Sequence, residues 1–182
     1  AQDAFAAASH QRAAASAAFQ AEEIAPFAPR DGVEPIGHDD GVRADTTPES
    51  LAKLRPAFTT DGTITAGNAS QITDGAAAVV LVAEDLATEL GLTPLARIRS
   101  TAFVAGPDVS LHEQPAAAIE AALGKAGLGV DDLVAIEINE AFAAVGLRST
   151  QRLGADAAIV NQHGGAIALG HPIGASGTRV VG

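Results

Sequence analysis

A glycine-rich segment near the end of the sequence carries a histidine that could do acid–base chemistry. The segment reads NQHGGAIALGHPIGASG from Asn161 to Gly177, and five of its seventeen residues are glycines, which let the backbone approach a ligand closely. His171 is followed by Pro172, a residue typical of the first turn of a helix. The helix dipole would then favour the neutral imidazole, which a general base needs. The alternative is a surface loop with an incidental histidine, and the glycines around His171 favour the catalytic interpretation.

Asn139 and Glu140 form a second candidate, because they follow a short apolar stretch. The residues from Val134 to Ile138 predict a strand, and open α/β folds place their ligands at the carboxyl ends of strands. An asparagine can hold a water or a carbonyl, and a glutamate can accept hydrogen bonds from backbone amides or from an imidazole. A helix N-cap formed by Asn139 explains the same residues, and the motif alone does not separate the two interpretations.

Small residues and a phenylalanine recur in a third region. Arg55 to Phe58 reads RPAF, and Thr65 to Ser70 reads TAGNAS. These side chains could line a narrow channel for a slender ligand arm. A plain turn at Gly67 and Asn68 explains the second stretch equally well.

The composition of the 182 residues limits the classes of function. Acidic residues outnumber basic ones by 22 to 11, which argues against a nucleic-acid partner. The chain has no cysteine, so disulfides and thiolate metal sites are excluded, and His163 beside His171 makes too poor a ligand set to predict a metal. No apolar run approaches the roughly 20 residues that cross a bilayer, and no secretory signal begins the chain. We expect a soluble cytoplasmic protein without a membrane partner.

The elements that must position these residues alternate between helix and strand. Helices are predicted over 1–24, 84–90, 115–126 and 141–153 and from about residue 172, and strands over 76–83, 95–105, 134–138 and 157–160. The continuous apolar run at 76–83 predicts a strand buried on both faces. Residues 26–65 are rich in Pro, Gly, Asp and Thr and predict an irregular excursion. The alternation predicts a layered α/β fold.

The three candidate regions, in this order, resemble the thiolase family. The strings NEAFA (139–143) and GGAIALGHPIGASG (164–177) are the most specific, and TTPESLAKLR (46–55) extends the resemblance over nearly the whole chain. Ketoacyl synthases and chalcone-synthase-like enzymes share the architecture but not these strings. The resemblance implies an α/β, thiolase-like layered αβαβα fold, of which only part is present in this chain. Residues 1–65 would be the end of the loop domain and a linker, and residues 66–182 most of the C-terminal domain, which would end before its last strands.

Thiolases use a cysteine thiolate to take an acyl group from a CoA thioester and pass it to a second thioester or to free CoA. The resemblance implies that His171 activates this cysteine and then helps to bind the enolate oxygen. It implies that Asn139 holds a water in the same oxyanion hole. It further implies that Ser70 donates a hydrogen bond in the CoA channel and that Arg43 lies at the nucleotide end. The other residues implied to line the channel are Ala57, Phe58, Ala66, Ala141 and Phe142.

The resemblance also implies which molecules the protein meets. CoA would be substrate and product, with no permanently bound cofactor; acyl-CoA thioesters would be the partners, and the protein a homodimer or homotetramer. Since the chain has no cysteine, we expect it to be part of a longer protein, with the nucleophilic cysteine in the missing first half and an acid/base cysteine shortly after Gly182. His163 stands where many relatives have asparagine. The competing hypothesis is a catalytically inactive thiolase-like protein that binds CoA or a lipid, or serves as an oligomerisation partner; the presence of both His171 and Asn139 argues against it.

Overall fold

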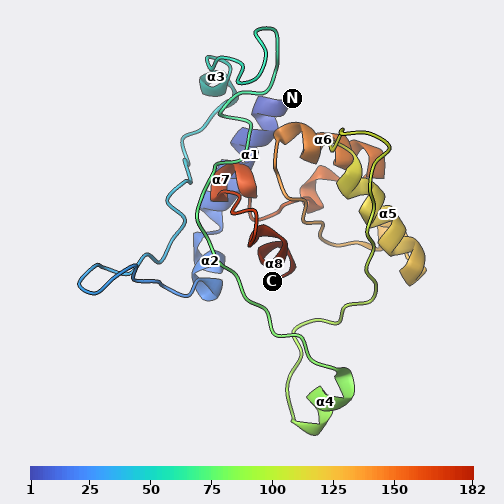
Figure 1. Ribbon diagram of the computed structural model, residues 1–182. Helices are drawn as coiled ribbons and strands as arrows, with labels where there is room; N and C mark the ends of the chain where they lie inside the picture. Colours follow the sequence, from blue (N-terminus) through green and yellow to red (C-terminus); the bar gives the residue numbers. More distant parts are fainter.

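Short helices connected by long extended segments make up the computed structural model, which describes residues 1–182 (Figure 1). Helix α1 packs against α3, α6 and α7, and α5 packs against α6. No helix is long and apolar enough to cross a membrane. The elements in chain order are α1 (Gln2–Ala15), α2 (Ala17–Glu23), α3 (Pro48–Leu51), α4 (Glu84–Glu89), α5 (Gln114–Ala126), η1 (Val130–Asp132), α6 (Ala143–Leu153), η2 (Ala157–Ile159), α7 (Ala166–Leu169) and α8 (Ser176–Val181).

Glycines end the two longest helices of the second half. Gly127 closes α5 with φ +68° and Gly154 closes α6 with φ +64°, left-handed conformations that favour glycine at a helix end. The helix predicted over 1–24 is interrupted at Ser16, which separates α1 from α2. The Ser16 hydroxyl lies 2.9 Å from His163 Nδ1, so a tertiary contact accompanies the break.

Two of the four predicted strands, 134–138 and 157–160, meet at a single bridge. Ile136 and Val160 form a parallel bridge, in which the Ile136 amide donates to Ile159 O at 2.8 Å and the Asn161 amide to Ile136 O at 2.9 Å. The strand predicted over 157–160 is wrong, because residues 157–159 form the 3₁₀-helix η2. Asp156 favours this turn, since its side chain accepts a hydrogen bond from the Ala158 amide at 2.9 Å.

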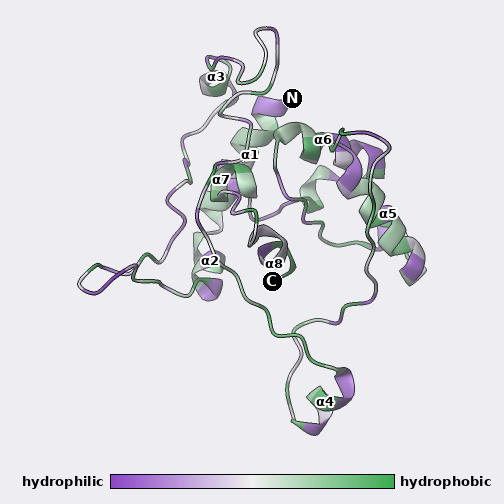
Figure 2. Ribbon diagram, viewed as in Figure 1, coloured by the Kyte–Doolittle hydropathy of each residue, from purple (hydrophilic) through white to green (hydrophobic).

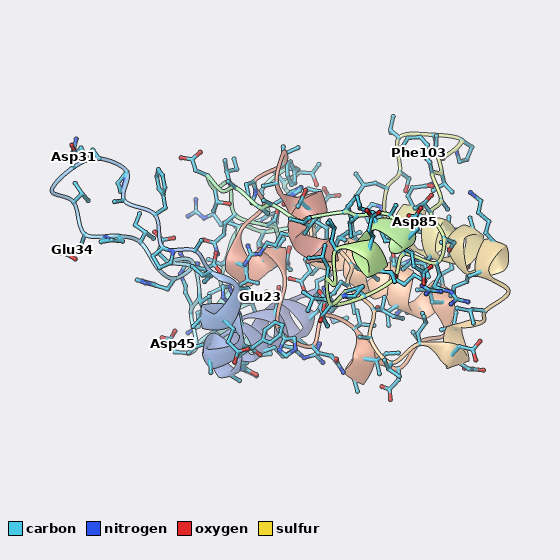
Figure 3. The ribbon with its side chains drawn as sticks, turned by 90° about the horizontal axis from the view of Figure 1, so that it is seen from below. Glu23, Asp31, Glu34, Asp45, Asp85 and Phe103 are labelled. Carbon is cyan, nitrogen blue, oxygen red and sulfur yellow. The ribbon has the colours of Figure 1, made fainter.

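The apolar segments 76–83 and 95–105 are extended but pair with no strand of the chain. Val80 is 92% exposed and Leu81 71% exposed, so the predicted burial of 76–83 on both faces is wrong for this chain. Phe103, in the second segment, is 95% exposed. A strand becomes buried only when neighbouring strands and helices cover it, and these segments instead run out to α4 and back (Figures 1 and 2). Phe103 accordingly projects from the body in Figure 3.

Two small clusters of buried apolar side chains support the segments that carry the candidate site. The larger one packs residues around the bridge between 136 and 160 against α5 and α6, and the smaller one packs α1 and α3 against the beginnings of α6 and α7. The buried members are Ala116, Ile136, Ile138, Val145, Leu153 and Val160 in the larger cluster, and Ala6, Leu51, Ala143 and Ile167 in the smaller.

Candidate active site

Asn139 and His171, 32 residues apart in the sequence, meet in the structure. Asn139 Nδ2 lies 3.3 Å from His171 Nε2. The N-cap interpretation of Asn139 is wrong, since α6 begins at Ala143 and its N-cap residue is Phe142. His171 is half-buried in a non-helical segment, and the residues Ile173 and Gly174 that follow are exposed. The two side chains therefore present an amide and an imidazole nitrogen to the same point.

The other side of the His171 ring contacts Ser176, a residue to which the sequence motif assigned no role. His171 Nδ1 lies 2.7 Å from Ser176 Oγ, and the Ser176 hydroxyl donates to Pro172 O at 3.0 Å. The helix predicted from about residue 172 is present but begins later, at Ser176, because residues 172–175 form a turn. His171 therefore does not lie in the first turn of a helix, where the helix dipole would act on it. Its imidazole instead contacts the Ser176 hydroxyl.

The backbone at His171 is held by Gln71. The His171 amide donates to Gln71 O at 3.0 Å, and Gln71 Nε2 donates to the carbonyls of Ile167 at 3.0 Å and Ala168 at 3.1 Å. Gly170 has φ +87°, and a Cβ there would overlap the Thr73 side chain. Position 170 therefore requires glycine, both for its positive φ and because a side chain would collide with Thr73. The hydrogen bonds of Gln71 fix the position of the His171 backbone.

Glu140 is buried, with an exposed fraction of 1%. Its Oε2 accepts hydrogen bonds from the Ser9 hydroxyl at 2.6 Å and the Ile167 amide at 3.1 Å, and its Oε1 accepts from Asn161 Nδ2 at 2.9 Å. Burial raises the pKa of this carboxyl, while these hydrogen bonds and the charge of Arg12 oppose the rise. The predicted interaction with backbone amides is confirmed at Ile167.

Asn161 ties the strand end that bears Asn139 to the glycine-rich segment. Its Oδ1 accepts from the Ile138 amide at 2.7 Å, and its Nδ2 donates to Ile138 O at 2.8 Å as well as to Glu140. Asn161 adopts φ +47°, which asparagine tolerates better than most residues. Arg12 of α1 adds hydrogen bonds to Val160 O at 2.6 Å and Ala157 O at 3.2 Å. The two segments that deliver Asn139 and His171 are therefore held in a fixed register.

Four of the residues expected to line the CoA channel are in contact in pairs, Ser70 with Ala141 and Phe58 with Phe142. Ala69 and Phe142 form an antiparallel bridge, and the Ser70 amide donates to Ala141 O at 3.0 Å. The Phe58 and Phe142 rings meet edge to face, with their centroids 5.9 Å apart. The remaining two, Ala57 and Ala66, each follow one member of the Pro56–Thr65 bridge.

Arg43 and His163 have different surroundings from the central pair. The Arg43 amide donates to His10 Nδ1 at 3.1 Å, and the Arg43 side chain is exposed. Burial, and then the charge of Arg43, lowers the pKa of the buried His10, with Asp45 opposing them. The His163 ring stacks on Phe19 with centroids 4.0 Å apart, so His163 packs α2 against the glycine-rich segment.

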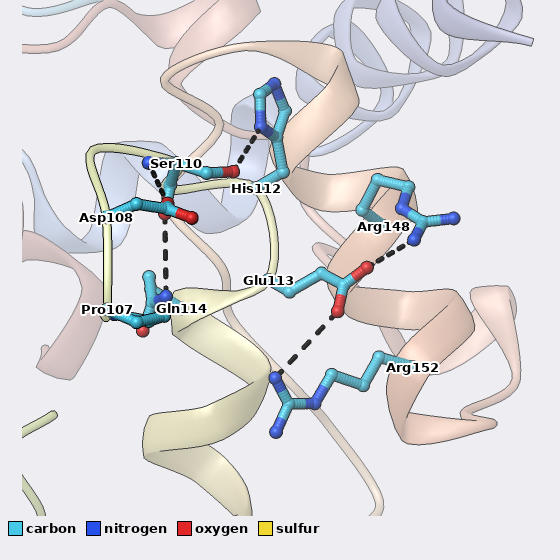
Figure 4. A pocket seen from close by; sticks show the side chains of 8 residues that line it. All are labelled: Pro107, Asp108, Ser110, His112, Glu113, Gln114, Arg148 and Arg152. Carbon is cyan, nitrogen blue, oxygen red and sulfur yellow. Dashed lines mark hydrogen bonds and ion pairs between the residues drawn. The ribbon is translucent and has the colours of Figure 1, made fainter. Parts of the chain in front are cut away.

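A polar pocket of about 530 Å³ lies elsewhere, between the 107–114 loop and α6 (Figure 4). Glu113 pairs with Arg148 and lies 3.9 Å from Arg152, so both cations already face a carboxylate. None of the predicted site residues lines this pocket. Its lining residues are Pro107, Asp108, Ser110, His112, Glu113, Gln114, Arg148 and Arg152.

Comparison with known families accounts for both halves of the chain. The model of the thiolase C-terminal domain matches residues 92–182, and that of the thiolase N-terminal domain matches residues 1–85. The chain belongs to the thiolase family. The family predicted from the NEAFA and GGAIALGHPIGASG strings is therefore confirmed. The predicted end of the loop domain near residue 65 falls inside the N-terminal match and stays a prediction.

Named relatives and solved thiolase structures agree with this assignment. The probable acetyl-CoA acetyltransferase of Mycolicibacterium smegmatis is 56% identical over 98% of this chain and 47% of its own length. The peroxisomal 3-ketoacyl-CoA thiolase B of Rattus norvegicus is 49% identical over 99% of this chain and 45% of its own length. The chain thus spans about half the length of the relatives it matches.

The solved structures show the thiolase fold for this chain. The acetyl-CoA acetyltransferase of Bacillus anthracis superposes with a TM-score of 0.91 at 40% identity, covering 99% of this chain and 47% of the other. The dimeric peroxisomal thiolase of Saccharomyces cerevisiae gives a TM-score of 0.91 at 41% identity, covering 99% and 46%. The predicted thiolase fold, with only part of it present here, is confirmed.

Proposed function

We propose that the complete protein transfers acyl groups between CoA thioesters, by condensing acetyl-CoA or by thiolysis of short 3-ketoacyl-CoA. The observation that carries the proposal is the contact between Asn139 and His171, with the ring nitrogen and the amide nitrogen 3.3 Å apart. Relatives at 49–56% identity are named acetyl-CoA acetyltransferase and 3-ketoacyl-CoA thiolase, which supports the same reaction class.

In this proposal His171 acts as the general base for a cysteine thiol. The chain itself has no cysteine, so the thiol comes from the rest of the protein. Nε2 of His171 takes the thiol proton, and the thiolate attacks the carbonyl carbon of the thioester. The bond to the CoA sulfur then breaks, so that CoA leaves as a thiolate and the acyl group stays on the cysteine. The protonated Nε2 then donates to the enolate oxygen in the condensation half-reaction, together with a water held by Asn139. A half-buried site makes these donors more effective than they would be in bulk water.

The channel residues would hold the pantetheine arm of CoA. The aromatic pair Phe58 and Phe142 and the small residues around Ser70 suit a slender, mostly apolar ligand, and the exposed Arg43 would meet the phosphates. CoA thioesters are then the partners, and CoA is a substrate or product, with no permanent cofactor. A homodimer or homotetramer and a cytoplasmic location stay predictions of the same proposal.

The test uses the complete protein with acetoacetyl-CoA and CoA, which thiolysis converts into two molecules of acetyl-CoA. We expect turnover, and we expect His171→Ala to lower kcat by about 10²- to 10⁴-fold, the usual contribution of a general base. Phe142→Ala should raise the KM for CoA by about twofold to tenfold, from loss of the aromatic contact. Tight CoA binding without turnover by the wild type would refute the proposal and favour the inactive, CoA-binding alternative.

A further inference from the structure

A chain of three hydrogen bonds passes through the His171 ring, from Asn139 to the Pro172 carbonyl. Asn139 Nδ2 faces Nε2 at 3.3 Å, Nδ1 faces Ser176 Oγ at 2.7 Å, and the Ser176 hydroxyl donates to Pro172 O at 3.0 Å. A serine hydroxyl has one hydrogen. The whole chain of contacts is satisfied when Nε2 accepts from the Asn139 amide, Nδ1 carries the ring proton and donates to Ser176 Oγ, and the Ser176 hydrogen points to the Pro172 carbonyl.

We propose that Ser176 is a positioning residue that holds His171 in the Nδ1-protonated tautomer. The proposal rests on the acyl-transfer function proposed above. The neutral ring then keeps its lone pair on Nε2, the nitrogen that faces Asn139. The hydrogen bond at one imidazole nitrogen sets which nitrogen carries the proton, so Ser176 selects the basic atom without touching substrate.

The surroundings of Ser176 protect this arrangement from water. Ser176 is 5% exposed, so water has little access to compete for its hydroxyl. Its backbone amide also donates to Pro172 O, at 2.9 Å, which fixes the serine relative to the residue that follows the histidine. The Pro172 ring further limits the backbone at this point. The acceptor for Nδ1–H is therefore in place before any substrate binds.

The same contact serves the protonated state. When Nε2 takes a proton from the nucleophile, Nδ1 keeps its hydrogen and remains a donor to Ser176 Oγ. The ring neither turns nor exchanges partners on that side, and a preorganised donor needs no rearrangement during the reaction. If Nε2 carried the proton in the resting state, it would have no lone pair for the thiol, and the ring could not act as its base.

The first test compares variants of the complete protein in thiolysis of acetoacetyl-CoA. Ser176→Ala removes the acceptor, and we expect kcat to fall by about 10- to 100-fold with KM within twofold, because a tautomer defect acts on the proton transfer. Ser176→Thr keeps the hydroxyl and should recover most of the lost kcat. Ser149→Ala is the matched control, since Ser149 is fully buried in α6 and its hydroxyl donates to the His112 carbonyl at 3.0 Å, away from the ring.

A second readout follows the nucleophile directly. Iodoacetamide alkylates the thiolate form of cysteine, so the pH dependence of inactivation reports how well His171 activates the thiol. We expect Ser176→Ala to move the midpoint of this curve to higher pH, and Ser149→Ala to leave it unchanged. A Ser176→Ala enzyme with kcat within twofold of wild type and an unmoved midpoint would overturn the assignment.

A third measurement needs no substitution at Ser176. Nitrogen-15 NMR of wild-type protein labelled in its histidine rings distinguishes protonated from unprotonated ring nitrogens, and His171→Ala identifies the signals. In the neutral ring we expect Nδ1 to be protonated and Nε2 unprotonated; the reverse pattern overturns the proposal even if Ser176→Ala does not fold. An inactive wild type with the expected tautomer would instead refute the proposed function alone.

Discussion

Replacing Glu140 with glutamine keeps the shape of the side chain but exchanges one carboxyl oxygen for an NH₂ group. Two donors that cannot rotate away approach different oxygens: Asn161 Nδ2 lies 2.9 Å from Oε1, and the Ile167 amide 3.1 Å from Oε2. The Asn161 amide cannot flip, because Ile138 occupies both its oxygen and its nitrogen. Glutamine offers one oxygen, so one donor faces another donor whichever way its amide is turned.

The expected loss of stability follows from that one unpaired donor. Glu140 is only 1% exposed, so water cannot replace the missing acceptor, and a buried donor without a partner costs about 1–3 kcal/mol. The argument holds for the ionised and the protonated carboxyl alike. Because burial raises the pKa of Glu140 in the folded state, its contribution to wild-type stability is greatest at low pH and declines as the pH rises through that pKa. The difference between Glu140→Gln and wild type should therefore narrow as the pH rises.

The assay is urea unfolding of the complete protein at one fixed protein concentration, so that any assembly affects all variants alike. Glu23→Gln is the control, since Glu23 is an exposed glutamate of α2 (Figure 3), and its change should stay within about 0.5 kcal/mol. Ser9→Ala removes the third donor, and the double substitution with Glu140→Gln should be non-additive. If the free energy of unfolding of Glu140→Gln stays within about 0.5 kcal/mol of the wild-type value at both acidic and neutral pH, the reasoning is refuted.

Three further predictions follow from the packing. Gly165→Ala would place a Cβ onto the Glu140 carboxyl carbon and should destabilise the protein by about 1–3 kcal/mol in the same assay. Gly174→Ala is the control, since a Cβ there would meet no atom within 4 Å, and equal effects of the two substitutions would contradict this prediction. His10 has a lowered pKa, so the stability that it contributes is present above pH 6.5, its ordinary pKa, and is lost as the pH falls below that value. The urea midpoint of the wild type should therefore drop on acidification, and that of His10→Gln should drop less. Residues 1–182 expressed alone should bind a hydrophobic dye and lack a cooperative melt, and a sharp transition from a monomer would argue otherwise.

The helices and the central pair of the site could be predicted because their signals are local. Gly127 marks the end of α5 by its backbone conformation alone, and the string around His171 is specific enough to identify the family. The same reasoning placed a helix at Pro172, where the turn over 172–175 delays α8 to Ser176. A proline permits the first turn of a helix, but it does not require one.

The supporting contacts could not be predicted from the sequence, because they join residues far apart along the chain. Ser9 and Glu140 are separated by 131 positions, and nothing near Ser9 indicates that its hydroxyl is needed. The prediction of a buried strand at 76–83 was wrong for a related reason. An apolar run such as 76–83 indicates that burial would stabilise the segment. Whether it is buried depends on neighbouring strands and helices, which the run itself does not specify.

The contacts of helix α1 cross the boundary between the two family matches. The helix lies in the segment matched by the N-terminal domain, yet Ser9 and Arg12 bond to residues matched by the C-terminal domain. The gap between the two matches, residues 86–91, instead falls on α4 and the residues directly after it, where the chain runs away from the body in Figure 1. The boundary between the family matches is therefore not a boundary between packed parts of the structure. In the complete protein, we expect a protease that cuts at α4 to yield two peptides that remain associated through the contacts around Glu140.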